Sequence, residues 1–215
     1  VSLEEAEKIY GKLLKEKTSK GYSEGEKKNN FPESLNPTTS KEVIILPQLL
    51  NAIDEDDVEK YINDNEWVAQ EKKDGERRMV ISKSDGEIIG LNKKGTTVQL
   101  PDSIIKSLRG IDCILDGEII GEKLFVFDLL SINGEGLRNI QATERLGYFH
   151  SLNFGDGIEI IQTASSREDK REMYDRLKIE NAEGIVFKKK DSFYTAGRPA
   201  SGGNQVKFKF YKTAT

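Results

Sequence analysis

The chain has 215 residues and a formal net charge of −4, from 33 Lys and Arg against 37 Asp and Glu, which allows one or two globular domains. Its longest apolar runs, Val43–Leu46 and Leu124–Phe127, are far shorter than the ~20 residues that cross a bilayer, which excludes a membrane span. Cys113 is the only cysteine, so an intramolecular disulfide is excluded, and the Lys- and Glu-rich N-terminus does not have the pattern of a signal peptide. We therefore expect a cytoplasmic protein.

The N-terminal part of the sequence predicts one helix and a linker. Ser2-Leu3-Glu4-Glu5 has the S-x-x-E form of a capping box, and apolar residues follow with helical spacing to about Lys17. The next stretch is rich in Ser, Gly, Asn, Pro and Lys, which is typical of a linker. We expect residues 1–40 to form this helix and linker, and residues 41–215 to form a separate domain. The segment Leu3–Tyr22 resembles the closing helix of a WGR domain, a small module found in DNA-repair proteins.

Short β-rich segments separated by turns, with a few helices between them, make up the rest of the chain. A helix is predicted from Asp54 to about Asp64, because acidic residues in a first turn are stabilised by the helix dipole. Asp74-Gly75 and Asp85-Gly86 are typical turn sequences, and strands joined by tight turns form antiparallel sheets. We therefore predict an α+β fold of antiparallel β-sheets flanked by helices. The predicted strands are Trp67–Lys73, Arg77–Lys83, Glu87–Asn92, Asp112–Ile120, Lys123–Leu130, Ile158–Thr163, Gly184–Lys190 and Gln205–Phe210, and the later helices are Thr143–Leu152 and Ser166–Leu177.

Basic residues gather near the C-terminus. Between Lys188 and Lys212 there are seven Lys and Arg against the single acid Asp191. This asymmetry is compatible with a face that binds nucleic acid, and equally with an ordinary solvated run of charges.

One segment carries a pattern with chemical meaning, K-x-D-G-x-R from Lys72 to Arg77. By itself the Asp-Gly pair would also suit a hairpin turn between charged strands. A lysine amine attacks phosphorus only when it is neutral, and burial beside other cations lowers a lysine pKa in the direction that this requires. In an extended segment adjacent side chains point to opposite faces, so only one of Lys72 and Lys73 can face a pocket.

Further segments accompany this pattern in a fixed order. Together they resemble motifs I, III, IIIa, IV and V of the superfamily of ATP-dependent DNA ligases, RNA ligases and mRNA capping enzymes, over roughly Lys41 to Lys212. The run Asn133–Arg138, followed by Glu144-Arg145-Leu146, is similar to DNA ligases in particular. After Lys72–Arg77, the matching segments are Leu115-Asp116-Gly117-Glu118-Ile119, Phe125–Leu130, Glu183–Lys188, and the pair Lys207 and Lys209.

The resemblance implies a role for each matching residue. Lys72 corresponds to the nucleophile that forms a covalent lysyl-AMP. The implied contacts to the nucleotide are made by Gln70, Glu71, Arg77, Lys93, Glu118, Phe127, Lys207 and Lys209, with Phe127 stacking on the adenine and the two later lysines on the α-phosphate. Glu118 and Glu183 correspond to residues associated with a divalent metal, and carboxylates suit Mg²⁺ or Mn²⁺.

The sequence departs from this pattern at three places. Lys93 stands where motif Ia usually has an arginine, and Gln205 stands where DNA ligases often have an aromatic residue. The OB-fold domain and its motif VI do not follow motif V in this sequence. We expect the full-length chain or a partner to supply them.

Taken together, these features predict the ligase nucleotidyltransferase architecture, which is ATP-grasp-like, and the adenylation domain of an ATP-dependent DNA ligase. Its cofactors would be ATP and Mg²⁺, and its partner nicked double-stranded DNA, in repair, replication or recombination. An RNA ligase, a GTP-dependent capping guanylyltransferase and a non-catalytic nucleic-acid-binding module remain as alternatives.

Overall fold

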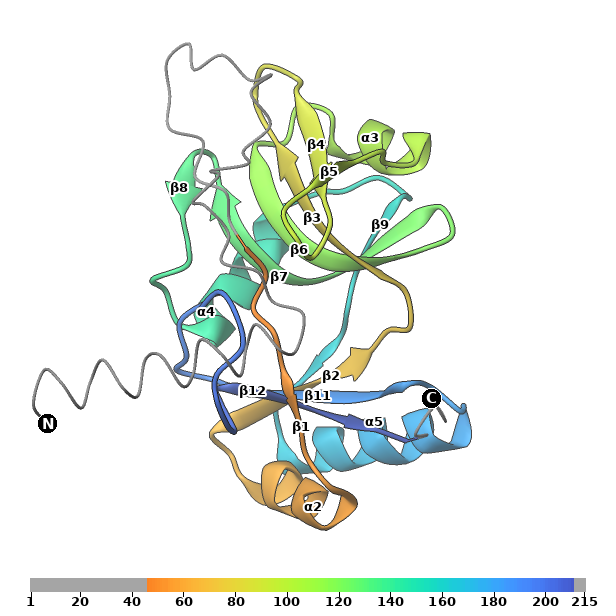
Figure 1. Cartoon of the computed structure of the whole chain (residues 1–215), viewed down its shortest axis with the longest axis vertical. Coiled ribbons are helices and arrows are strands. Elements are labelled where there is room, and N and C mark those ends of the chain that lie inside the picture. The colour runs from red at the N-terminus through yellow and green to blue at the C-terminus, as the bar shows by residue number, and fades with distance from the viewer. Residues whose placement is uncertain (1–45, 211–215) are drawn as a thin grey trace, which may run out of the picture. The chain divides into compact units, whose positions relative to one another are not determined.

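The computed structural model describes residues 46–210, which form an α+β fold with two mainly antiparallel sheets, as predicted (Figure 1). The N-terminal helix, the linker, the WGR-like segment and the boundary near residue 40 lie outside the described residues. No helix between residues 46 and 210 is both long and apolar enough to cross a bilayer.

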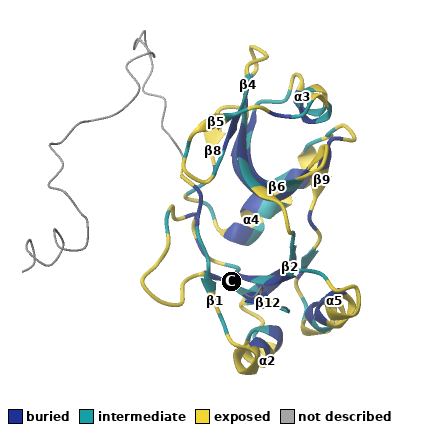
Figure 2. Cartoon of the chain, turned by 45° about the vertical axis from the view of Figure 1, so that its right-hand side comes forward, coloured by how far each residue is buried: buried dark blue, intermediate teal, exposed yellow. Residues whose placement is uncertain are grey.

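The five-stranded sheet is built from segments far apart in the chain. Its order is β1-β12-β11-β2-β10, and all neighbouring strands are antiparallel except β1 and β12. The strands are β1 (Asn51–Ala52), β2 (Trp67–Lys72), β10 (Thr163–Ala164), β11 (Gly184–Lys189) and β12 (Gln205–Lys209), and the helices packed on one face are α2 (Glu55–Asn63) and α5 (Arg167–Ile179). Figure 2 shows the exposed sides of α2 and α5 turned away from the strands.

Local sequence explains the position of α5. The Ser166 side chain accepts a hydrogen bond from the Asp169 backbone N–H at 3.0 Å and so caps the helix, as its N-cap position predicts. On the inner side, the fully buried Lys170 donates to the carbonyl oxygens of Tyr61, Asp64 and Trp67, at 2.6–3.0 Å. Since a helix leaves its last carbonyls without partners, this ammonium links the end of α2 to α5 and β2.

The seven-stranded sheet forms the other half of the described fold. Its order is β5-β4-β3-β6-β7-β8, with β9 added in parallel to β7. The largest apolar core lies on the face covered by α3, α4 and η1, and includes Val80, Leu115, Leu124 and Phe149. The elements are β3 (Glu76–Ser82), β4 (Ile88–Leu91), β5 (Thr97–Val98), α3 (Asp102–Leu108), β6 (Cys113–Ile120), β7 (Lys123–Ile132), β8 (Glu135–Gly136), α4 (Ala142–Gly147), the 3₁₀ helix η1 (Tyr148–Ser151) and β9 (Ile158–Ile160).

Most of the predicted strands and helices are confirmed, with small shifts at their ends, but two connections differ. The predicted strand Ile158–Thr163 is wrong as a single element, because it divides into β9 and β10, which belong to different sheets. Asp74-Gly75 does not close a hairpin, since β2 and β3 also lie in different sheets. A Cβ atom at Gly75 would lie 2.3 Å from the Ile119 carbonyl oxygen, so the glycine is needed where the chain passes close to β6.

A buried charged group joins the two sheets. Asp128 of β7 accepts hydrogen bonds from Arg145 of α4, at 2.9 and 3.1 Å, and from Lys188 of β11, at 3.0 Å. All three side chains are at most 1% exposed. Burial raises the pKa of Asp128, but the two cations outweigh that effect and hold it below its usual value.

Candidate active site

A pocket lies between the inner faces of the two sheets. We call it the inter-sheet pocket, and its position brings together segments that are more than 130 residues apart. It is lined by Leu50, Gln70, Glu71, Lys72, Lys73, Arg77, Glu118, Phe127, Val186 and Gln205.

Strand alternation decides which side chains of the five-stranded sheet face this pocket. Ala69, Ile185 and Val206 pack against the helices. The residues next to each of them along its strand therefore face the other side of the sheet, toward the pocket. The register aligns Gln70, Val186 and Lys207 across β2, β11 and β12, and in the next row it aligns Lys72, Gly184 and Lys209. A Cβ atom at Gly184 would lie 2.0 Å from the Phe208 carbonyl oxygen, so a side chain is excluded in the middle of that row.

The two lysines of the second row, Lys72 and Lys209, share one acid. The Lys72 ammonium is hydrogen-bonded to Glu183 Oε2, and Lys209 Nζ lies 2.7 Å from Glu183 Oε1. Burial raises the pKa of Glu183, but the hydrogen bonds from Lys209 and Lys72 outweigh it and lower the pKa overall. Lys72 therefore has a carboxylate as its direct partner, in addition to the cations that were expected near it.

Lys207 forms no ion pair with an acid in the described part of the chain, and Glu183 acts on it only through its charge. Burial lowers its pKa, and the positive charges of Lys72, Arg198 and Lys209 lower it further. Clustered cations of this kind favour binding of an anion, since a bound phosphate would relieve their repulsion.

The seven-stranded sheet contributes an arginine and two acids. Arg77 donates two hydrogen bonds to the Asp116 carboxylate, from Nε at 2.6 Å and from Nη2 at 2.7 Å. Glu118 lies opposite Arg77 in the register, and its carboxylate forms no hydrogen bond or ion pair with residues 46–210. Burial raises the pKa of Glu118 to about 7, against the lowering effect of the Arg77 and Lys72 charges.

The pocket has an apolar side chain on each of two opposite sides, between which a flat ring could lie. Phe127 of β7 and Val186 of β11 line it from opposite sheets, and the Arg77 guanidinium carbon lies 4.3 Å from the Phe127 ring centroid. Gln70 donates through Nε2 to Thr163 Oγ1, at 2.9 Å, and to the Phe127 carbonyl, at 3.4 Å. Gln70 Oε1 is therefore the side-chain atom that remains to accept a hydrogen bond from a ligand.

Not every predicted residue lines the pocket, since Glu183, Lys207 and Lys209 lie beside Lys72 and Val186 without being part of the lining. Glu71 lines the pocket, but its carboxylate pairs with Lys73, with Oε2 and Nζ 2.7 Å apart. Lys93 is exposed in the turn after β4 and does not line the pocket.

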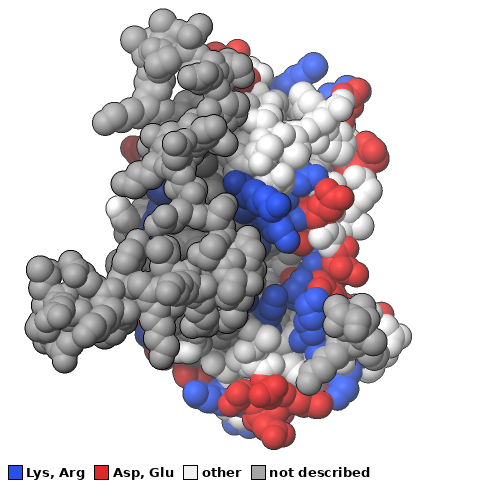
Figure 3. All heavy atoms as spheres, viewed as in Figure 1, with Lys and Arg blue, Asp and Glu red and all other residues white. Residues whose placement is uncertain are grey.

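The C-terminal basic stretch is not one continuous face. Lys188 is buried between the sheets, whereas Lys189 pairs with Asp191 at the surface, and Lys212 lies outside the described residues. Figure 3 nevertheless shows Lys and Arg gathered across the middle of one face, with acidic residues over α2 at its lower end.

The metal prediction depends on two carboxylates, that of Glu118, which lines the pocket, and that of Glu183, which is bonded to Lys72. No cluster of three or more His, Cys, Asp or Glu able to hold an ion occurs between residues 46 and 210. Mg²⁺ in nucleotide sites is commonly held by one or two carboxylates together with substrate phosphates. The two acids therefore fit an ion that arrives with a nucleotide, and they do not form a metal site on their own.

Some residues of the site had no predicted role. Asp116 stands inside the segment that pointed to Glu118, and its alternation with Glu118 along β6 could have indicated an inward side chain. Gln48 and Tyr194 contact Asp116 or Arg77, although no local pattern marks either of them.

Comparisons with known proteins agree with this geometry. Residues 121–209 match the family model described as the ATP dependent DNA ligase domain. This part of the chain is therefore similar to ATP-dependent DNA ligase domains. A DNA ligase of Natronomonas pharaonis is 28% identical over 125 residues, which are 58% of this chain and 22% of that protein. The chain therefore spans about a fifth of that ligase.

Solved ligase domains share the fold. The ligase domain of Mycobacterium tuberculosis LigD has a TM-score of 0.63 and 19% identity, over 76% of this chain and 59% of that one. A mycobacterial DNA ligase D complexed with ATP has a TM-score of 0.61 and 18% identity, over 78% and 60% of the two chains. A Lig E DNA ligase has a TM-score of 0.55 and 18% identity, over 77% and 68%. The predicted ligase architecture is thus confirmed.

Proposed function

We propose that this ligase domain performs the adenylation step, with Lys72 as the nucleophile and ATP as the nucleotide. Lys72 Nζ attacks the α-phosphorus, forming a P–N bond as the bond to pyrophosphate breaks, and the amine loses a proton. The AMP then passes to the 5′-phosphate at a nick in double-stranded DNA. The neighbouring 3′-hydroxyl displaces AMP and completes the phosphodiester bond.

The observation that carries this proposal is the position of Lys72 among the other charged groups. Lys207 and Lys209 stand beside it on the same face of the sheet, where they would stabilise the negative charge on a phosphoryl group during transfer. Glu118 and Glu183 would hold Mg²⁺ together with the nucleotide phosphates, and the ion would supply further neutralising charge.

The preference for ATP over GTP is supported by Gln70. Because its Nε2 is engaged by Thr163 and the Phe127 carbonyl, its Oε1 is the group available to a base held between Phe127 and Val186. An acceptor suits the exocyclic amino group of adenine, and it would meet an acceptor oxygen at the same position of guanine.

Labelling with ATP that is radioactive at the α-phosphate, in the presence of Mg²⁺, tests the proposal. We expect label on Lys72, none in Lys72→Ala, and retained label in Lys73→Ala, which removes the adjacent lysine instead. Full labelling of Lys72→Ala would show that another residue is the nucleophile. Competition with unlabelled GTP, and sealing assays on adenylylated nicks in DNA and in RNA, separate a DNA ligase from the other nucleotidyltransferases.

We also propose that an OB-fold domain, provided by a longer chain or by a partner, assists this step. Addition of such a domain in trans should raise the rate of self-adenylation. Roles in repair, replication or recombination and a cytoplasmic location follow from the same proposal.

A further inference from the structure

Four chain segments meet around the carboxylate of Asp116, beside the inter-sheet pocket. Asp116 lies on β6 and is fully buried. Its Oδ2 accepts from Arg77 Nη2 of β3, at 2.7 Å, and from the hydroxyl of Tyr194, at 2.7 Å. The Tyr194 hydroxyl in turn accepts from the Gln48 backbone N–H at 2.9 Å, and the Gln48 carbonyl accepts from Arg77 Nη2 at 3.3 Å.

These four contacts form a closed ring of hydrogen bonds, which we call the Asp116 ring. Gln48, Asp116 and Tyr194 are each at most 8% exposed. In such surroundings every bond of a fully satisfied network is strengthened, and an orphaned member is costly. The ring is therefore specific to a hydroxyl at position 194, because a phenyl ring would leave the Gln48 N–H without its acceptor.

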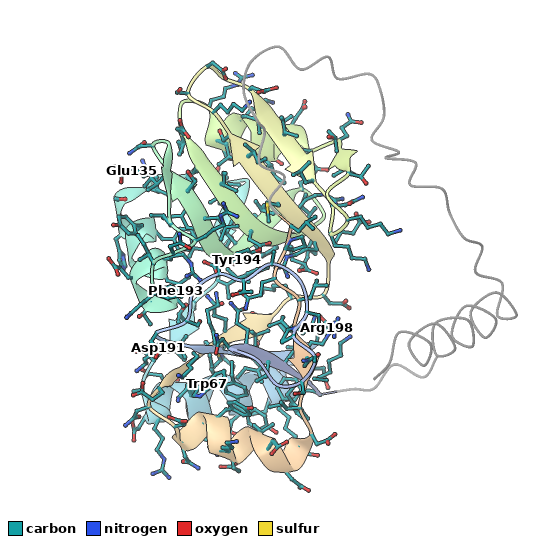
Figure 4. The ribbon with its side chains drawn as sticks, turned by 60° about the vertical axis from the view of Figure 1, so that its left-hand side comes forward. Trp67, Glu135, Asp191, Phe193, Tyr194 and Arg198 are labelled. Atoms are coloured by element: carbon teal, nitrogen blue, oxygen red, sulfur yellow. The ribbon has the colours of Figure 1, made fainter. Side chains whose placement is uncertain are left out.

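The loop between β11 and β12 brings Tyr194 to this place. Figure 4 shows the loop passing from Asp191 to Arg198 beside both sheets, with Tyr194 turned toward their junction. The loop is fixed to the segment before β1 by backbone hydrogen bonds between Leu49 and Gly197, at 2.8 Å, and between Gly197 and Pro47, at 3.0 Å. The Tyr194 ring is thus held, and its hydroxyl is aimed at Asp116.

The ring leaves Arg77 a single orientation. Nε and Nη2 are both engaged by Asp116, and Nη1 donates to no residue in the described part of the chain. The guanidinium carbon lies 4.3 Å from the Phe127 ring centroid and Arg77 lines the inter-sheet pocket, so Nη1 is the donor that remains for a ligand there. The direction of Nη1 depends on how firmly Asp116 is held from its other side.

We propose that Tyr194 is a positioning residue, which acts through Asp116 to fix the Arg77 guanidinium for contact with the nucleotide. The inference rests on the proposed function for the chemistry that Arg77 serves. The competing explanation is that Tyr194 only fills the small core of Met79, Leu91 and Leu130, a task that phenylalanine would perform equally well.

Full-length protein should be compared as wild type, Tyr194→Phe, Arg77→Ala and the double variant, by the rate of covalent labelling across ATP concentrations. We expect Tyr194→Phe to lower kcat/KM for labelling roughly tenfold, as the loss of one buried hydrogen-bond partner usually does. In the Arg77→Ala background the same substitution should change the rate less than about twofold, because its effect passes through Arg77. The matched control is Tyr174→Phe, at a buried tyrosine of α5 whose hydroxyl bonds to no residue between 46 and 210.

A Tyr194→Phe protein that labels as fast as wild type would overturn the proposal. An equal loss in both backgrounds would do so too, since it would indicate a structural role independent of Arg77. If wild type forms no lysyl-AMP, the proposed function fails, and a second measurement decides the inference by itself. The NMR signal of the Arg77 Nε–H group, assigned by its absence in Arg77→Ala, should exchange slowly with solvent in wild type and faster in Tyr194→Phe. An unchanged exchange rate would refute the positioning role.

Discussion

The charges between the two sheets and the charges on the outer helices contribute to the protein in different ways. Asp128, Arg145 and Lys188 are almost fully buried and satisfy one another, whereas the α5 pair of Arg176 and Glu180 is 43% and 53% exposed. Buried charges are strongly destabilising when one partner is lost, while exposed pairs contribute little. Of the charges compared in the described part of the chain, the buried group therefore contributes far more to the structure than the exposed pair does.

The largest effect is expected from breaking the buried group. Asp128→Ala would leave Arg145 and Lys188 buried without their shared acid, which should lower the free energy of unfolding by about 3–5 kcal/mol. Equilibrium unfolding in urea measures this change in the free energy of unfolding. The matched control is Asp191→Ala, which removes the partner of Lys189 at the surface and should change stability by less than about 1 kcal/mol. Equal effects of the two substitutions would show that burial does not distinguish them.

The stabilising effect of the buried Asp128 carboxylate should depend on pH. The folded-state pKa of Asp128 lies below its ordinary value of 3.8, so its ionised form stabilises the fold above that pH. That contribution is lost as the pH falls from about 4 through the folded-state pKa. The stability difference between wild type and Asp128→Asn should therefore be constant from pH 7 to 5 and shrink below pH 4. A difference that grows in acid would have the wrong sign for this explanation.

A smaller effect is expected in the inter-sheet pocket, where apolar contact replaces charge. If Phe127 stacks on adenine, Phe127→Ala should weaken ATP binding by about 1–3 kcal/mol, as loss of base stacking does elsewhere. Calorimetric titration of ATP into Lys72→Ala, which cannot form the covalent bond, measures this without interference. Phe127→Tyr keeps the ring and should bind within about threefold of the parent. ATP affinity that is unchanged in Phe127→Ala would place the base elsewhere.

Sequence periodicity predicted the strands, and with them the faces of the side chains, but not the sheet to which each strand belongs. Alternation along β2 put Gln70 and Lys72 on one face because that pattern is local, but the prediction that only one of Lys72 and Lys73 faces a pocket is wrong, since Lys73 follows the strand and both line the inter-sheet pocket. The division of β2 and β3 between two sheets depends instead on how Gly75 passes Ile119, which is a contact between distant segments. The same limit applies to Tyr194 and Gln48, which are 146 residues apart in the chain and form one hydrogen bond.

The smallest effect belongs to the outer helices. Arg176→Ala removes an exposed ion pair between Arg176 and Glu180, which lie one helical turn apart. In this pair Arg176 Nη1 lies 3.1 Å from Glu180 Oε2. Such pairs contribute about 0.3–0.5 kcal/mol to stability in dilute salt. At 1 M salt the Debye screening length falls to about 3 Å, so the attraction between the two charges should be lost. Unfolding of wild type and Arg176→Ala should therefore converge at high salt, whereas the loss in Asp128→Ala should persist, since Asp128, Arg145 and Lys188 are buried away from solvent ions. Salt that abolished both losses would mean that the group around Asp128 is open to solvent.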